Sequence, residues 1–267
     1  MFLSERKKWS SNSIAALMIL MAATAVVGCS KGDGLHELEL PTDSICTDTT
    51  IHLNGSGEPQ ATLHLNMKFI NKKEYAHVNT ALINSGVLTL VRPDTLPYSD
   101  QSMRRTVDAF VRQYARDYKE AARLILEQEP DNLQQLNWKY VVDTQLKSGR
   151  DGNVVLLAKV TLFEGGEQET TFTIAKNIDR HSGKLLTLKD LYNDEQRRQL
   201  TDNIVSELKS MEHCFSLEAL QEEGFFQGIE PYATENFFLT DEGITFIYVP
   251  GEIAPAGKGE IRVKIKD

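Results

Sequence analysis

Residues 138–178 read WKYVVDTQLKSGRDGNVVLLAKVTLFEGGEQETTFTIAKNI, and this stretch decides the fold of the chain. Apolar and polar residues alternate from Trp138 to Leu146, which is typical of a strand with one buried face. Residues 154–163 are almost continuously apolar, as expected of a central strand, and residues 170–178 are expected to form a third strand. Both connecting segments are short and contain Gly, so the three strands are predicted to form an antiparallel meander.

A strand and two helices are expected before this meander. Residues 61–69 alternate between apolar and polar, which predicts a half-buried strand. The spacing of apolar residues predicts a short helix over residues 75–82. It also predicts a longer helix from about Asp100 to Glu129, where Pro130 stops it.

The long helix is the basic element of an acidic protein. Its Lys and Arg side chains are Arg104, Arg105, Arg112, Arg116, Lys119 and Arg123. One interpretation is a solvated helix face with local ion pairs to Asp and Glu. The other is a patch that binds an anionic ligand.

Helices and closing strands are expected after the meander. Asn193 can cap a helix in which Leu200, Ile204 and Leu208 recur at helical spacing, and residues 217–223 predict a shorter helix. Three further strands are predicted at residues 236–240, 244–249 and 260–265. The sequence therefore predicts an α+β fold, in which an antiparallel or mixed sheet packs against several helices.

Composition narrows the class of protein. The 267 residues are 41% hydrophobic and 25% charged, which is typical of a globular chain with a sizeable core. The formal net charge is −9, which argues against nucleic acid as a partner because phosphate binding needs a basic surface.

Residues 1–28 are interpreted as a signal peptide. A basic segment at residues 6–8 precedes a short apolar run over residues 14–27. The run ends in VVGC (residues 26–29), which resembles the lipobox of bacterial lipoproteins, here of Bacteroidetes type. The resemblance implies cleavage before Cys29, whose thiol and new amino terminus would carry acyl chains such as palmitate. The alternatives are an ordinary signal peptide or an N-terminal anchor helix.

The segment after the cleavage site suggests where the protein resides. Ser30 rather than Asp follows Cys29, which in a Gram-negative cell resembles an outer-membrane address, facing either the periplasm or the cell surface. Residues 29–49 are polar and are predicted to be the lipidated cysteine and a flexible tether. Cleavage removes three cations and one anion, which changes the net charge from −9 to −11.

Two cysteines remain after Cys29 is lipidated. An oxidising compartment would permit a disulfide between Cys46 and Cys214, and the alternative is two unrelated small buried residues. No ligand-type spacing of Cys and His occurs, so no metal site and no cofactor are expected.

No catalytic motif stands out, so the chain is not expected to be an enzyme. The sequence has no Gly-x-Ser-x-Gly elbow, no His-Glu-x-x-His and no phosphate-binding Gly loop. A dense aromatic group over residues 225–248 is expected to be core. Tyr232 follows Pro231 in a predicted loop and is the best candidate for an exposed binding aromatic.

The final third of the chain carries a family resemblance. The motifs are NID (residues 177–179), SGKLLTLKDLY (182–192), FFLTDEGITF (237–246) and GEIAP (251–255). They resemble the RsiV-like extracytoplasmic domain family, that is, domain of unknown function 3298 with a 4163-like N-terminal half. The resemblance covers residues 50–267, in two halves of about 50–180 and 181–267. Gly251 and Lys258 depart from the family pattern, and the family's cytoplasmic anti-sigma segment and transmembrane helix are missing.

The resemblance implies a non-catalytic α+β module of the cell envelope. Within GEIAP, Glu252 belongs to a strand exit set by proline, and it joins Tyr232 as a candidate binding residue. The leading hypothesis is an outer-membrane lipoprotein that binds an extracytoplasmic ligand such as a basic, lysozyme-type muramidase. The acidic surface of the lipoprotein would attract such a cationic partner. The alternatives are a module that binds peptidoglycan or polysaccharide, and an envelope hydrolase with an unrecognised site.

Overall fold

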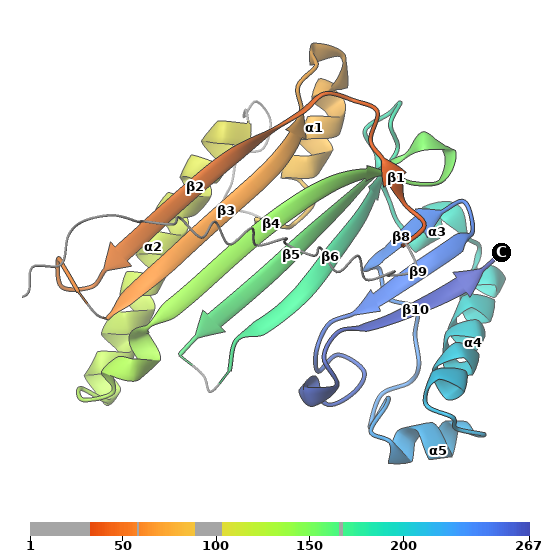
Figure 1. Cartoon of the computed structure of the whole chain (residues 1–267). Coiled ribbons are helices and arrows are strands. Elements are labelled where there is room, and N and C mark those ends of the chain that lie inside the picture. Colours follow the sequence, from red (N-terminus) through yellow and green to blue (C-terminus); the bar gives the residue numbers. More distant parts are fainter. Residues whose placement is uncertain (1–32, 58, 89–102, 166–167) are drawn as a thin grey trace, which may run out of the picture. The chain divides into compact units, whose positions relative to one another are not determined.

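The computed structural model describes residues 33–57, 59–88, 103–165 and 168–267, in which residues 34–267 form one compact unit with two sheets (Figure 1). The expected signal peptide and Cys29 lie outside the described residues, as does the predicted start of the long helix. Among the residues described, no helix combines the length and apolarity needed to cross a membrane.

The larger sheet has seven strands and contains the predicted meander. Its strands, in spatial order, are β2 (Thr42–His52), β3 (Gln60–Ile70), β4 (Trp138–Ser148), β5 (Val154–Glu164), β6 (Thr170–Ile178) and β7 (Leu185–Leu186), with β1 (His36–Glu37) paired to the end of β4. Neighbours are antiparallel except β3 and β4, which run parallel. Helices α1 and α2 lie between them in the chain and provide the long crossover that a parallel pair needs. The sheet is therefore mixed, and the predicted α+β class is confirmed.

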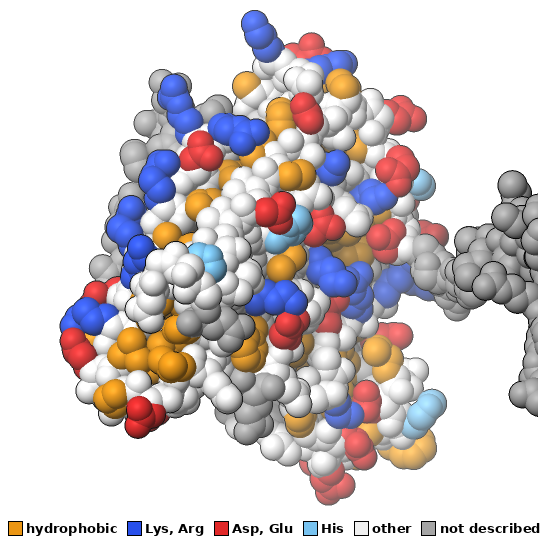
Figure 2. Space-filling view, turned by 60° about the vertical axis from the view of Figure 1, so that its left-hand side comes forward, with side chains coloured by type: hydrophobic (Ala, Val, Ile, Leu, Met, Phe, Trp, Pro, Cys, Tyr) orange, Lys and Arg blue, Asp and Glu red, His pale blue; other side chains and the backbone are white. Residues whose placement is uncertain are grey.

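Helices α1 (Ala76–Ile83) and α2 (Met103–Gln128) contribute to the core beneath this sheet. Phe110 and Tyr114 of α2 pack against Tyr140, with ring centroids 5.7 and 5.8 Å away, and Tyr118 meets Trp138 edge to face at 5.4 Å. The six Lys and Arg side chains of α2 are exposed, and Figure 2 shows basic side chains gathered along the side of the molecule that carries this helix.

The smaller sheet forms a second core with the C-terminal helices. Its order is β10 (Ile261–Lys266), β9 (Gly243–Tyr248) and β8 (Phe237–Thr240), all antiparallel, and the helices are α3 (Leu188–Leu191), α4 (Asp194–Met211) and α5 (Leu217–Glu222). Short 3-10 turns occupy Lys73–Tyr75, Leu133–Leu136, Arg150–Gly152 and Ala256–Lys258. The late aromatic residues are core as predicted, since Phe225, Phe226, Phe237, Phe238, Phe246 and Tyr248 are all buried.

Two asparagine side chains join the sheets where β6 meets β8. Asn177 donates from Nδ2 to the Phe237 carbonyl (2.9 Å) and accepts from the Leu239 N–H (3.0 Å). Asn236 accepts from the Ala175 N–H (2.7 Å) and donates to the carbonyls of Thr173 (2.8 Å) and Ile247 (3.0 Å). These amides satisfy backbone groups that would otherwise be left unpaired between two sheets.

The predicted tether over residues 29–49 is wrong from Thr42 onward, because β2 runs from Thr42 to His52 and pairs with β3 along its whole length. Ile45 and Ile51 are buried, and Thr47 and Thr49 lie between them on the same face of the strand. The polar residues that suggested a tether lie largely on the exposed face of the strand. The β-branched residues at every second position favour the strand itself. The compact unit consequently begins at Gly34 instead of near residue 50.

Candidate functional site

The candidate site is a shallow, open hollow of about 360 Å³ between the first turns of α4 and the loop that precedes β8, and it is called the cavity below. Its lining combines charged, polar and aromatic side chains from two segments that are distant in sequence, residues 188–201 and 232–235. The lining residues are Leu188, Asp194, Arg197, Arg198, Thr201, Tyr232, Ala233 and Glu235. Its volume falls within the range of ligand pockets, and most of its lining side chains are polar, so it suits a polar ligand rather than an apolar one.

The helix wall is organised by the cap of α4. Asn193 accepts from the Gln196 N–H (2.9 Å), and the Gln196 side chain accepts from the Asn193 N–H (2.9 Å), so both ends of the capping box are closed. Asp194 follows in the first turn, where a carboxylate is favoured by the helix dipole. The spacing of three, four and seven residues then places Arg197, Arg198 and Thr201 beside it on one helix face.

The loop wall is built around Tyr232. Its hydroxyl donates to Glu252 Oε1 (2.8 Å), and Glu252 Oε2 accepts from the Val249 N–H (2.8 Å). The Tyr248 hydroxyl donates to the Tyr232 carbonyl (2.6 Å), and the two rings meet edge to face at 6.0 Å. The structure therefore brings together the two predicted binding residues, Tyr232 and Glu252.

Tyr232 is held in place without being covered. Its side chain remains 37% exposed, while partial burial, followed by the Glu252 hydrogen bond and charge, raises the pKa of its hydroxyl. Since an ordinary tyrosine already titrates near pH 10, Tyr232 stays protonated at any physiological pH. The ring is consequently a fixed, neutral and accessible surface.

The charged side chains of the cavity differ in how far they are already engaged by partners within the protein. Arg197 is paired with Asp194, yet its Nε is buried and has no hydrogen-bond partner in the part of the chain that the structure describes. Glu235 accepts from the Leu188 N–H (3.0 Å), which fastens α3 to the loop. Arg198 is exposed. The site thus offers guanidinium donors and carboxylate acceptors next to an aromatic ring, a set suited to a polar ligand that carries hydroxyl and carboxylate groups.

Sequence patterns did not single out the helix side of this cavity. Asp194, Arg197, Arg198 and Glu235 were each one of many surface charges in the sequence. The available signal was the cap at Asn193, which fixes where α4 begins and therefore which charges share a face. Their proximity to Tyr232 depends on tertiary contacts.

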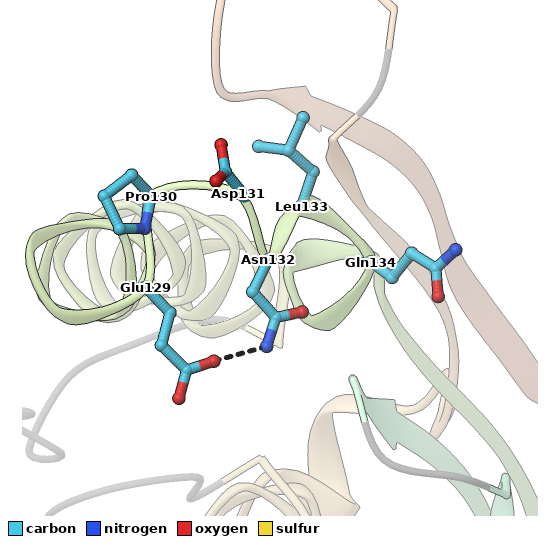
Figure 3. Close-up of a pocket in the computed structure, with 6 residues that line it drawn as sticks. All are labelled: Glu129, Pro130, Asp131, Asn132, Leu133 and Gln134. Carbon is cyan, nitrogen blue, oxygen red and sulfur yellow. Dashed lines mark hydrogen bonds between the residues drawn. The ribbon is translucent and has the colours of Figure 1, made fainter.

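A second hollow, of about 590 Å³, lies where Pro130 ends α2 (Figure 3). It is lined by six consecutive residues, Glu129 to Gln134, and Asn132 donates to Glu129 across it (2.6 Å). Leu133 is 48% exposed. Because a single loop supplies every side chain, groups from different elements do not converge here, and the hollow is a weaker candidate than the cavity beside Tyr232.

The other sequence-predicted residues lie away from the cavity. Cys46 and Cys214 are both free thiols, so the structure does not contain the disulfide that an oxidising compartment would permit. Cys46 is exposed on β2 and donates to Asn66 Oδ1 (3.4 Å), so it is not a small buried residue either. Cys214 follows α4 and is partly buried.

Comparisons with known proteins agree on one family. A family model described as "Protein of unknown function (DUF3298)" matches residues 189–267. No curated protein matches the chain.

Solved structures share the fold over most of the chain. A member of the DUF3298 family from Bacteroides fragilis has a TM-score of 0.70 and 21% identity, covering 86% of this chain and 92% of that one. A DUF3298 family protein from Pseudomonas aeruginosa has a TM-score of 0.61 and 19% identity, covering 85% of this chain and 90% of that one. At these identities the likeness shows the fold alone. The finer resemblance to RsiV-like and 4163-like domains stays a prediction. Residues 189–267, which hold most of the candidate site, match DUF3298, a family of unknown function. These two solved members of the family share the fold of this chain.

Proposed function

We propose that this chain is a non-catalytic lipoprotein of the cell envelope that binds an extracytoplasmic ligand in the cavity beside Tyr232. Acylation of Cys29 would anchor it in the outer membrane, facing the periplasm or the cell surface. The observation that carries the binding role is the cavity itself, which places a fixed, accessible tyrosine opposite two arginines of α4.

A saccharide that carries carboxylates, such as a peptidoglycan fragment, suits this lining best. A sugar ring can lie against the ring of Tyr232, and its hydroxyls can pair with Asp194 and Glu235. Arg198, which is exposed, can bind a carboxylate with two parallel hydrogen bonds, while Arg197, paired with Asp194, adds a second positive charge. A cavity of about 360 Å³ is large enough for a ligand of this class.

Calorimetry with purified muropeptides tests this proposal. A chain that starts at Ser30 retains the whole compact unit. Tyr232→Ala should weaken binding by about tenfold or more, as expected for an aromatic residue at the centre of a binding site. Tyr232→Phe keeps the ring and loses only the hydrogen bond to Glu252, so it should bind nearly as well as the wild type.

Phe215→Ala is the matched control, because Phe215 is 99% exposed and lies outside the cavity lining. Its affinity should equal that of the wild type. Absence of heat with every muropeptide would contradict the saccharide proposal, as would equal losses for Tyr232→Ala and Phe215→Ala.

A cationic muramidase is the second candidate ligand, and the charge distribution favours it. Residues 181–267 contain 16 Asp and Glu against nine Lys and Arg, a net charge of −7. Phe215 is exposed between the acidic helices α4 and α5 and could serve as an apolar anchor. Muramidase binding should weaken steeply with added salt and should depend on Phe215, whereas saccharide binding should depend on Tyr232 and change little with salt.

A further inference from the structure

Helix α2 carries a line of basic side chains along its outer face. Arg105, Arg112, Arg116, Lys119 and Arg123 are separated by seven, four, three and four residues, and all five are exposed. At about 100° per residue these positions project within about 40° of one direction. They cover 18 residue steps, or about 27 Å of a straight helix. We refer to these five residues as the basic ridge.

The basic ridge lies directly opposite the buried side of α2. Phe110, Tyr114 and Tyr118 pack into the core and project about 140–180° away from Arg105. The ridge is consequently the outermost line of the helix, in agreement with the basic side chains seen along this side of the molecule in Figure 2. A flat surface can contact all of its members at once.

The middle of the basic ridge has no acidic counterpart. Arg123 forms ion pairs with Glu120 and Glu127, which offset its positive charge. Arg116 donates to the neutral side chain of Gln113. Within the described part of the chain, Arg112, Arg116 and Lys119 form no salt bridge, so their three positive charges face solvent.

The charge of the ridge contrasts with that of the remaining molecule. Helix α2 has six Lys and Arg against four Asp and Glu, whereas residues 181–267 have a net charge of −7. A solvated helix face needs no segregation of this kind, because interspersed Glu and Lys pairs keep a helix soluble. A row of exposed cations on one outer line, three of them without a salt bridge in the described residues, is the arrangement expected for contact with an anionic surface.

We propose that the basic ridge of α2 binds anionic lipid headgroups and lays the domain against the membrane. This inference rests on the proposed lipid anchor at Cys29, since only five residue steps separate Cys29 from the start of the compact unit at Gly34. Five extended residues span at most about 17 Å, so the domain stays beside the bilayer. Each Lys or Arg at an anionic surface strengthens binding by about fivefold, and four to eight are typical of such segments.

Vesicle sedimentation with the chain that starts at Ser30 tests the ridge without the acyl chains. The protein should bind vesicles of phosphatidylcholine with one third phosphatidylglycerol and should not bind phosphatidylcholine alone. Combined Arg112→Glu, Arg116→Glu and Lys119→Glu should reduce binding to the anionic vesicles by about a hundredfold or more. Added salt should have the same direction of effect.

The matched control reverses three exposed lysines outside the ridge, with Lys73→Glu, Lys159→Glu and Lys189→Glu. The two triple variants have equal net charge, so a difference between them reports the position of the charge. Circular dichroism should show unchanged helix content in both. The milder variant with Gln at positions 112, 116 and 119 provides the comparison if charge reversal disturbs folding.

Equal binding of the two triple variants would overturn the proposal, as would equal binding to neutral and anionic vesicles. Binding to a soluble anionic polysaccharide without binding to vesicles would also overturn it, because the ridge would then recognise a polymer. Failure of acylation at Cys29 would remove the anchor but would leave the vesicle result unchanged, so the two proposals fail separately.

Discussion

Asn177 shows how a single side chain can carry a junction. Its amide accepts from the Leu239 N–H and donates to the Phe237 carbonyl, and the side chain is 1% exposed. The residue belongs to the Asn177-Ile178-Asp179 motif, which the sequence offered as a family signature. The structure gives that motif a physical role, because it pairs β6 with β8 where no strand ladder forms.

Replacement of Asn177 by Ala should destabilise the fold by about 2–5 kcal/mol, since it leaves a buried N–H and a buried carbonyl without partners. Urea unfolding gives this value directly. Asn203→Ala is the matched control, because the partly buried side chain of Asn203 forms a hydrogen bond only with Gln199, one turn earlier on α4, among the residues described. Equal stabilities of the two variants would contradict the role assigned to Asn177.

The carboxyl of Asp190 provides a pH-dependent prediction at the same scale. The Lys184 ammonium, followed by the N–H and hydroxyl of Thr187, lowers its pKa to about 2. Because the pKa in the folded chain lies below that in the unfolded chain, Asp190 stabilises the fold above about pH 4 and loses this effect as the pH falls towards 2.

Lys184→Gln should move the pKa of Asp190 back towards its ordinary value. A carboxyl titration followed by nuclear magnetic resonance measures the change. Lys189→Gln is a suitable control, since Lys189 is exposed and forms no salt bridge in the described part of the chain. An unchanged pKa in the Lys184 variant would show that Thr187 alone controls the carboxyl.

At the scale of elements, the turn between β4 and β5 presses against the smaller sheet. A Cβ built on Gly149 would lie 2.5 Å from the Leu239 carbonyl oxygen and 2.7 Å from Val155 Cγ2. The Arg150 side chain continues this contact by donating from Nε to the Thr240 carbonyl (3.0 Å). The hairpin of the meander is therefore also a docking surface for β8.

Gly149→Ala should consequently destabilise the chain by about 2 kcal/mol or more, in the range of overpacked core substitutions. Gly257→Ala is the matched control, because nothing lies within 4 Å of its Cβ position. Neither glycine has a positive φ, so the comparison isolates the close approach. Thermal unfolding of both variants measures the difference, and similar melting temperatures would argue against tight docking of β8.

At the scale of the whole molecule, the compact unit begins at Gly34, only five residues after Cys29, the proposed site of acylation. Ten of the 21 residues predicted to form the tether, residues 36–37 and 42–49, belong to β1 and β2 instead. A lipid anchor at Cys29 would therefore leave only a short connection, and the orientation of the domain would depend on its own surface.

Cys29→Ser should abolish labelling with palmitate and release the protein from the membrane fraction, because the thiol is the site of lipid attachment in a lipoprotein. Cys46→Ser provides the control and should be labelled like the wild type, since Cys46 is a free thiol on β2. Labelling that persists in the Cys29 variant would show that the chain is not acylated there. Release of an unlabelled wild-type protein would instead favour an ordinary signal peptide.

Local patterns in the sequence were sufficient for most elements. The period-two alternation in β3 and β4, the apolar run in β5, the cap of α4 at Asn193 and the stop at Pro130 each depend on a few neighbouring residues. Strand β2 was missed because its polar face dominates its composition. Of the candidate site, Tyr232 and Glu252 could be named from the sequence, but the arginines of α4 could not.

The sequence by itself determined the α+β class, the order of the main elements from β3 onward and the basic line along α2. Periodicity, caps and helical spacing are local properties of the chain. Only the tertiary structure decided that β3 lies parallel to β4, that β2 completes the larger sheet and that Asn177 and Asn236 join the two sheets. The same holds for the cavity, where Tyr232 meets α4 although more than 30 residues separate them. Such contacts depend on which buried faces pack together, and local sequence patterns do not specify these packing partners.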